Sequence, residues 1–333
     1  MPEKFLWGRR EGGRAALRLG HTPEEAVTLT TTGGQGRRPV PVHRSVRRRG
    51  TSYGRSFEIV APAVLLPAVT ARLVGATWDV EPGATPETSW RLQHLPGAGW
   101  QASRDGRPLS RAEGPDGAVE RLVSGVERWI AAEATEAVFV DAGVVGWRGR
   151  ALVLPGRHLP GRTTLVAHLV RAGAAYLSDV FAVLDEDGRV HAYPRPMAIG
   201  RPEWGVRQRR LAPAPAAGSP PLPVGMIARL AYHPGGTWTE RLTRGQATLT
   251  LIDAAVTGPA RAHEVARIAA AAARDALAVA GHRGEAGETA RMLLAQMDEA
   301  LAPSSGHEAL RATHSSSRIE WTTESRQAPR TKT

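Results

Sequence analysis

One segment near the middle of the chain constrains the fold more than any other. An apolar run, Arg150–Pro155, leads into a loop bounded by Gly156 and Gly161. Apolar residues at helical spacing then follow in Thr163–Ala172, and a second apolar run occupies Tyr176–Asp185. A strand, a glycine loop, a helix and a further strand in this order predict a βαβ crossover, which is typical of an α/β protein.

The loop between the two glycines has the spacing of a phosphate-binding loop, with one exception. Such loops read G-x-x-x-x-G-K-[ST], and here Arg162 occupies the lysine position. Backbone N–H groups of such a loop surround a phosphate, and the N-terminus of the following helix adds positive potential. The expected phosphate contacts are Gly156, Arg157, Gly161, Arg162, Thr163 and Thr164. A degenerate loop that only reverses the chain is the alternative, because the spacing alone is a weak signal among 36 glycines.

An acidic residue in the following strand completes the candidate site. Asp179 lies 16 residues after Thr163, where a carboxylate can hold Mg²⁺ or accept a proton from an attacking hydroxyl. Asp179 and Arg162 are therefore the candidate catalytic residues, and Thr163 and Asp179 are the candidate metal ligands. A capping or solvated aspartate is the alternative. Arg195 and Arg283 are further candidate phosphate contacts, with ordinary structural roles as their alternative.

Composition divides the chain into four parts. Residues 1–54 are rich in Arg, Gly and Thr and predict a basic disordered arm, and residues 303–333 predict a disordered tail. Residues 55–135 predict a small N-terminal α/β region, and residues 136–302 predict the domain that carries the phosphate loop. Helices are predicted at Ala118–Ala132, His263–Ala280 and Glu288–Ala302, strands at Val138–Asp141, Met226–Tyr232 and Ala247–Ile252, and a loop over 201–223.

The net charge of +11 comes mainly from the N-terminal arm. Residues 1–55 hold 12 basic and 4 acidic side chains, and residues 303–333 hold 5 and 3. An arm of this kind binds nucleic acid weakly and in a salt-dependent way, but the sequence contains no recognised base-reading module, and its nine tryptophans are dispersed. We therefore expect no nucleic-acid binding beyond weak contacts of the arm.

Residue usage excludes several kinds of chemistry. The chain has no cysteine, which excludes disulfides and thiolate zinc sites. Lysine occurs only as Lys4 and Lys332, so arginine must supply any cationic contact to phosphate in the body of the protein. No apolar run predicts a bilayer-spanning segment or a secretory signal. We expect a cytoplasmic protein without membrane insertion, and the sequence leaves a homo-oligomer open.

Taken together, the motifs between residues 138 and 197 resemble the HPr serine kinase-like family. The matching segments lie at Ala142–Val145, Arg150–Gly156, Thr163–Leu165, Tyr176–Asp179 and His191–Pro196. The resemblance implies a P-loop kinase domain of the HPr kinase and phosphoenolpyruvate carboxykinase type, with a mixed sheet and flanking helices. It also implies ATP and Mg²⁺ as cofactors and a protein or peptide serine as the phosphate acceptor.

Three residues depart from the pattern of that family. Arg162 replaces the loop lysine, Val180 replaces a second acidic residue after Asp179, and Asp141 stands where relatives usually carry histidine. The Pro-Gly-Arg-Asn segment of the bifunctional kinase/phosphorylases is also missing, so neither phosphorylase activity nor HPr as a substrate is expected. Two interpretations follow: a divergent serine kinase with weak activity, or a catalytically inactive pseudokinase that binds nucleotide or a partner as a regulator or scaffold.

Overall fold

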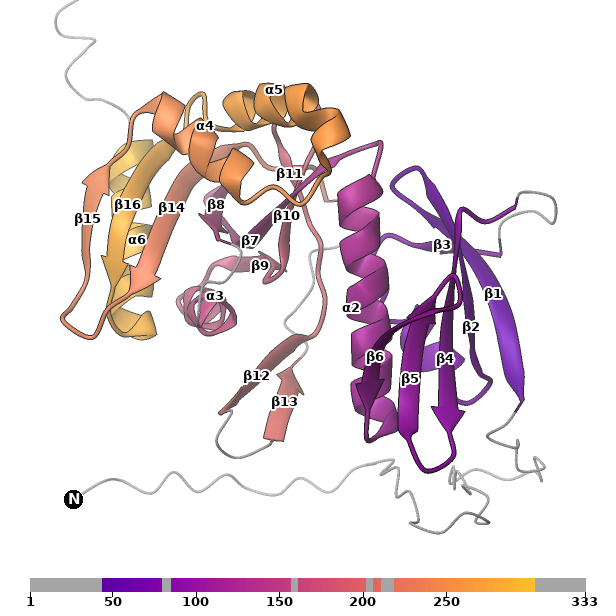
Figure 1. Ribbon diagram of the computed structural model, residues 1–333. Helices are drawn as coiled ribbons and strands as arrows, with labels where there is room; N and C mark the ends of the chain where they lie inside the picture. Colours follow the sequence, from indigo (N-terminus) through magenta and orange to yellow (C-terminus); the bar gives the residue numbers. More distant parts are fainter. Residues whose placement is uncertain (1–43, 80–84, 157–160, 202–205, 211–218, 303–333) are drawn as a thin grey trace, which may run out of the picture.

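The computed structural model describes residues 44–79, 85–156, 161–201, 206–210 and 219–302 (Figure 1). The architecture is mixed α/β, with a six-stranded N-terminal sheet, an eight-stranded C-terminal sheet and several helices. Both sheets combine parallel and antiparallel neighbours. A separate hairpin is formed by β12 (Met197–Arg201) and β13 (Val206–Arg210). None of the described helices is both long and apolar enough to cross a membrane.

The N-terminal sheet has the strand order β3-β1-β2-β4-β5-β6 and packs against helix α2 (Pro115–Glu133) (Figure 1). Its strands are β1 (Ser45–Ser52), β2 (Arg55–Pro62), β3 (Thr77–Trp78), β4 (Thr88–Leu95), β5 (Gly99–Arg104) and β6 (Arg107–Ala112). A short helix, α1 (Leu66–Thr70), follows β2. The apolar stripe that predicted a helix at Ala118–Ala132 is buried against this sheet, so that prediction is confirmed.

Strand β1 corrects the expected boundary of the basic arm. Residues 45–54 were predicted to be disordered, but β1 pairs antiparallel with β2 along its whole length. The connecting residues Tyr53 and Gly54 both have positive φ angles, 49° and 76°, which is the two-residue turn that suits a twisted hairpin. Arg47 and Arg49 also lie 3.3 and 3.5 Å from the buried Glu58 carboxylate, so the hairpin neutralises part of the charge.

The C-terminal sheet has the strand order β11-β10-β7-β8-β14-β16-β15, and β9 also pairs with β7. Its strands are β7 (Val138–Trp147), β8 (Arg150–Pro155), β9 (Ala175–Ser178), β10 (Phe181–Leu184), β11 (Val190–His191), β14 (Val224–Tyr232), β15 (Trp238–Arg241) and β16 (Leu277–Arg283). Helices α3 (Arg162–Arg171) and α6 (Ala286–Leu301) cover one face, and α4 (Arg244–Asp253) and α5 (Ala262–Ala272) cover the other (Figure 1).

The predicted crossover is confirmed by the pairing of β7. Strands β8 and β9 both run antiparallel to β7 and lie on opposite sides of it, so they are parallel to each other. Helix α3 connects them. The glycine loop therefore begins at the carboxyl end of a buried strand, where ligands of open α/β sheets usually bind.

Three predictions for the C-terminal half of the chain are wrong. Ala247–Ile252 is not a strand but lies inside helix α4, which starts with a capping box between Thr243 and Gln246. The predicted helix over His263–Ala280 ends at Ala272, and the apolar residues from Leu277 onward form β16 between β14 and β15. A continuous apolar run suits a strand that is buried on both faces. Strand β13 likewise lies in the predicted loop over 201–223.

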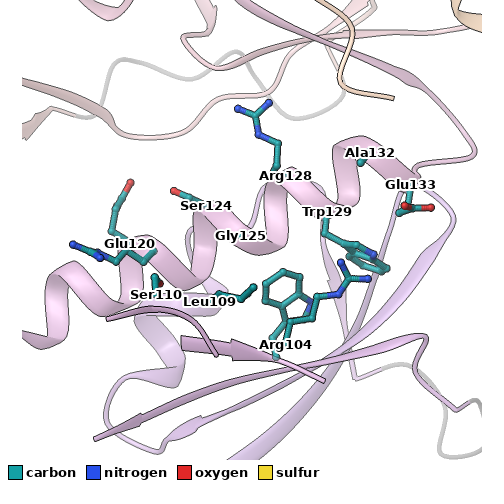
Figure 2. Close-up of a pocket in the computed structure, with 12 residues that line it drawn as sticks. Arg104, Leu109, Ser110, Glu120, Ser124, Gly125, Arg128, Trp129, Ala132 and Glu133 are labelled. Carbon is teal, nitrogen blue, oxygen red and sulfur yellow. The ribbon is translucent and has the colours of Figure 1, made fainter. Parts of the chain in front are cut away.

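A groove of the N-terminal region runs along α2 (Figure 2). Its lining combines apolar and charged side chains, among them Trp90, Arg104, Leu109 and Trp129. Arg128 belongs to the rim and projects from the side of α2 that faces away from the strands. Its guanidinium lies 2.8 Å from the Asp141 carboxylate of β7, in the C-terminal sheet.

Candidate functional site

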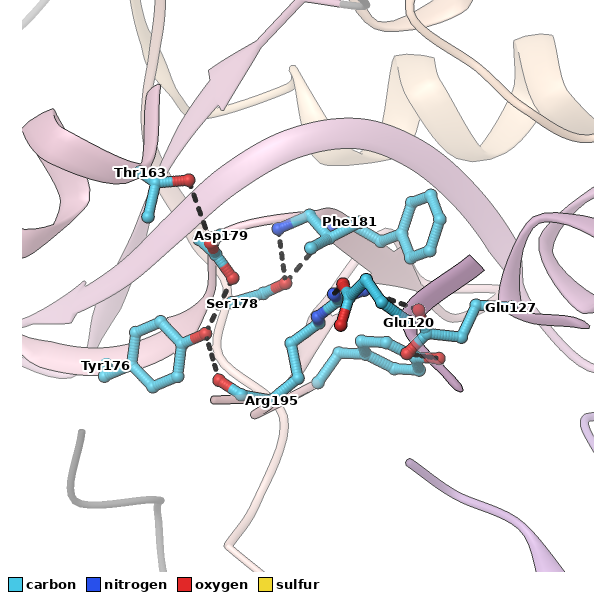
Figure 3. Close-up of polar contacts among 10 residues, drawn as sticks. Glu120, Glu127, Thr163, Tyr176, Ser178, Asp179, Phe181 and Arg195 are labelled. Carbon is cyan, nitrogen blue, oxygen red and sulfur yellow. Dashed lines mark hydrogen bonds and ion pairs between the residues drawn. The ribbon is translucent and has the colours of Figure 1, made fainter. Parts of the chain in front are cut away.

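A break between β9 and β10 positions the candidate acidic residue. The predicted single strand Tyr176–Asp185 is interrupted at Asp179 and Val180, because the Ser178 hydroxyl accepts hydrogen bonds from the N–H groups of Val180 and Phe181, at 3.2 and 3.0 Å. The bend separates the Asp179 carboxylate from the regular pairing of the sheet. Asp179 is buried beside the first turn of α3 (Figure 3).

The first turn of α3 brings the predicted metal ligands together. Gly161 precedes the helix with φ +74° and ψ 18°, a left-handed conformation that favours glycine. Two residues later, the Thr163 hydroxyl donates a hydrogen bond of 2.9 Å to Asp179 Oδ2 (Figure 3). A hydroxyl and a carboxylate thus meet at a helix N-terminus, where the backbone favours an anion.

Arg162 is directed into the protein. Its Nη1 donates a 2.6 Å hydrogen bond to the Gly156 carbonyl oxygen, and its Nε donates a 3.1 Å bond to the Asp179 carbonyl oxygen. The side-chain stem lies over strand β7 at Gly143, where an added Cβ would lie 3.1 Å from Arg162 Cγ. Burial lowers the pKa of Arg162, and Asp141 and Asp179 oppose that shift. Arg162 therefore holds the start of the loop and the strand break together.

Arg283 supplies a second cation at the same place. It ends β16, is buried, and has its guanidinium against Gly161: a Cβ added there would lie 2.6 Å from Arg283 Nη2. Burial lowers the pKa of Arg283. The candidate phosphate contact proposed for Arg283 from the sequence therefore lies directly at the N-terminus of α3.

Asp141 is the second acidic residue that the fold brings near the loop, after Asp179. Its backbone oxygen accepts a 2.9 Å hydrogen bond from the Gly156 N–H. Its buried carboxylate pairs through Oδ2 with Arg128 Nη1 of α2 at 2.8 Å, while Oδ1 is buried without a hydrogen-bond partner in the part of the chain that the structure describes. Asp141 thus links the glycine loop to helix α2 of the N-terminal region.

A polar network extends from Asp179 to α2 (Figure 3). The Tyr176 hydroxyl lies 2.9 Å from Asp179 Oδ1 and 2.8 Å from the Arg195 carbonyl oxygen. The Arg195 guanidinium forms ion pairs with Glu127 and, at 3.0 Å, with Glu120. Because both of these carboxylates belong to α2, Arg195 connects the two parts of the protein, and its guanidinium is directed to α2.

Glu127 makes the stability of this network depend on pH. Burial raises its pKa from 4.5 to about 7, although Arg195 favours the ionised form. Between pH 4.5 and about 7, Glu127 loses its proton in the unfolded chain and keeps it in the folded protein. The contribution of Glu127 to the free energy of unfolding therefore falls as pH rises through this range. The shift corresponds to about 3 kcal/mol.

We expect Glu127→Gln to remove this pH dependence. Urea unfolding of the wild type and the variant at about pH 5 and about pH 8 measures it, since the change in the free energy of unfolding between the two conditions should be smaller in the variant. An equal change in both proteins would show that Glu127 is ionised in the folded protein throughout this range.

The structure places the predicted site residues as follows. Gly156, Gly161, Arg162, Thr163 and Asp179 come together at the carboxyl end of β8 and the N-terminus of α3. Thr164 is exposed in the first turn of α3. Arg157 lies outside the described residues.

Tyr176 and Glu127 were not predicted. Tyr176 precedes Asp179 by three residues, so the sequence already indicated that the two side chains could lie close together. Glu127 lies in another region of the chain, and no local pattern connects it to Arg195.

Thr163 and Asp179 are the predicted metal ligands, and they supply one hydroxyl and one carboxylate. Among the described residues, no three His, Asp or Glu side chains are grouped so that they could hold a metal. Mg²⁺ commonly takes one or two carboxylates and completes its octahedral shell with phosphate oxygens and water. Thr163 and Asp179 could supply oxygen ligands of this kind, and the Arg283 guanidinium lies beside Gly161 at the same helix N-terminus.

Comparison of the chain with known protein families, with curated proteins and with solved structures finds no match. The function is therefore inferred from the residues of the site.

Proposed function

We propose that this protein binds a nucleoside triphosphate such as ATP together with Mg²⁺ and transfers phosphate slowly to a serine of a protein or peptide. The proposed fold is a divergent P-loop kinase domain of the HPr kinase type. The observation that carries the proposal is the 2.9 Å hydrogen bond between Thr163 and Asp179 at the N-terminus of α3.

The arrangement supports a division of roles. Thr163 and Asp179 would hold Mg²⁺, which neutralises charge that develops on the phosphates. The N–H groups that begin α3 and the Arg283 guanidinium would hold the phosphate oxygens. Tyr176 orients the Asp179 carboxylate through its hydroxyl. Asp179 is also the candidate base for the proton of the acceptor hydroxyl.

A non-catalytic nucleotide-binding regulator is the second candidate, and two observations favour it. The Arg162 guanidinium is bound to two backbone carbonyl oxygens. Val180 packs against the hydrophobic core around α2, so the position after Asp179 offers no second carboxylate. Loss of one preorganised charge contact commonly lowers a catalytic rate by about 10²–10³-fold.

Calorimetry of the full chain with ATP and Mg²⁺, followed by a phosphate-transfer assay, tests the proposal. We expect binding that weakens when Mg²⁺ is chelated, and slow hydrolysis or transfer. Absence of ATP binding would refute both candidates. Binding without any turnover would support the regulator.

A gain-of-function variant separates the two candidates further. Arg162→Lys combined with Val180→Asp restores the two charged groups at the positions that the resembled family uses. An increase in turnover would indicate that the site has decayed from a kinase. The single Arg162→Lys variant is the control, because it returns the lysine and leaves the acidic position apolar.

A further inference from the structure

An exposed aromatic ring lies one side chain away from the candidate phosphate site. Tyr232 ends β14 and is 49% exposed. In the sheet it is opposite Arg283, whose guanidinium carbon lies 5.1 Å from the centre of the tyrosine ring. The same guanidinium lies against Gly161 at the N-terminus of α3. Arg283 therefore connects an aromatic surface with the place where phosphate would bind.

Tyr232 and Arg283 lie on the face of the sheet that α3 covers. Side chains of a strand alternate between its two faces. Met226, Ala228 and Leu230 pack in the cluster that contains α3 and α6, so Tyr232 continues their row. Val279 belongs to the same cluster and Arg283 continues its row along β16. The aromatic ring, the cation and the helix N-terminus are thus on one side of the sheet.

A second aromatic group lies on the opposite face. Trp238 is opposite His282 in the pairing of β15 with β16 and contacts its ring at 5.2 Å. The His282 ring stacks on His233 at 5.1 Å. His282 and Arg283 are consecutive residues of β16, so their side chains point to opposite faces of the sheet. The rings of Trp238, His282 and His233 therefore lie on the face opposite Arg283. Trp238 is 52% exposed, nearly the same fraction as Tyr232, which makes it a matched control.

We propose that Tyr232 is the surface on which the nucleobase of the bound nucleotide stacks, an inference that rests on the proposed function. A nucleotide joins a flat aromatic base to a chain of phosphates, and this side of the sheet joins a flat aromatic ring to a buried cation and a helix N-terminus. Stacking on an aromatic side chain tolerates every base, because each base has a π face. The proposed ligand is a nucleoside triphosphate, and the contact of its base with Tyr232 increases its affinity.

Inorganic triphosphate is the control ligand, because it has the phosphates of ATP and lacks the base. Calorimetry of the full chain with MgATP and with Mg²⁺ and inorganic triphosphate should show tighter binding of ATP. Tyr232→Leu, which keeps apolar bulk, should weaken ATP binding about tenfold, as expected for one lost base–aromatic stack. Its affinity for triphosphate should be unchanged. Tyr232→Phe should bind both ligands like the wild type, and so should Trp238→Leu.

The outcomes distinguish failure of this inference from failure of the proposed function. If the wild type binds ATP and triphosphate equally, or if Tyr232→Leu weakens both alike, the base does not stack on Tyr232 although the phosphate site remains. If Trp238→Leu weakens ATP binding and Tyr232→Leu does not, the base lies on the other face. If the wild type binds neither ligand, the proposed function fails and this inference fails with it.

Discussion

Replacing Asp179 with asparagine should remove the Mg²⁺-dependent part of ATP binding. The carboxylate is buried, accepts a hydrogen bond from Thr163 and lies 2.9 Å from the Tyr176 hydroxyl. Asparagine keeps the shape and one acceptor oxygen but loses the negative charge that would hold the metal. If the wild type transfers phosphate, the rate should fall about 10²–10³-fold, the size expected for one preorganised charge contact.

Calorimetry with ATP in the presence of Mg²⁺ and then of a chelator measures this effect. Asp187→Asn is the matched control, because Asp187 is an exposed aspartate in the turn between β10 and β11. A normal melting temperature of the Asp179 variant would show that the loss is not caused by unfolding. If the variant retains the full effect of Mg²⁺ on ATP affinity, Asp179 is not a metal ligand.

The crossover was predictable because its signals are local. The apolar run before Gly156, the spacing to Gly161 and the apolar stripe after Thr163 each act within a few residues of the chain. These segments are close in the sequence, so no contact with a distant part of the chain is needed to bring them together. The same is true of the Thr163 and Asp179 pair, which the short connection through α3 holds in place.

The wrong predictions arose where the local pattern allows two structures. Alanine-rich segments suit a helix or a buried strand, so the sequence does not show that the helix ends at Ala272 and that β16 follows from Leu277. The direction of Arg162 was not predictable either, because it depends on carbonyl groups at Gly156 and Asp179. The contact of Arg195 with α2 joins residues 68 positions apart.

Replacing Arg195 with methionine should destabilise the protein strongly at alkaline pH. Its guanidinium is the ion-pair partner of Glu127, whose side chain is 1% exposed. Removing one partner of a buried pair commonly costs about 3–5 kcal/mol, because the remaining charge stays buried. Arg195 lowers the pKa of Glu127, so without it the carboxyl group should take up a proton more readily.

The loss of stability in Arg195→Met should therefore be larger at alkaline than at acidic pH. Well above the pKa of Glu127, the variant must bury an unpaired carboxylate or bind a proton from alkaline solution, and both are unfavourable. At acidic pH Glu127 is neutral in both proteins, so the difference in the free energy of unfolding should shrink. Urea unfolding at both pH values measures it, with exposed Arg229→Met as a control that should leave stability nearly unchanged.

The double variant Arg195→Met with Glu127→Gln identifies the cause. If the unpaired buried charge is what destabilises the single variant, the neutral amide should recover much of the loss at alkaline pH, since it removes the charge and keeps the side-chain volume. If the double variant is as unstable as Arg195→Met alone, the cost lies in the other contacts of Arg195. The ion pair of Arg195 with Glu120 is one such contact.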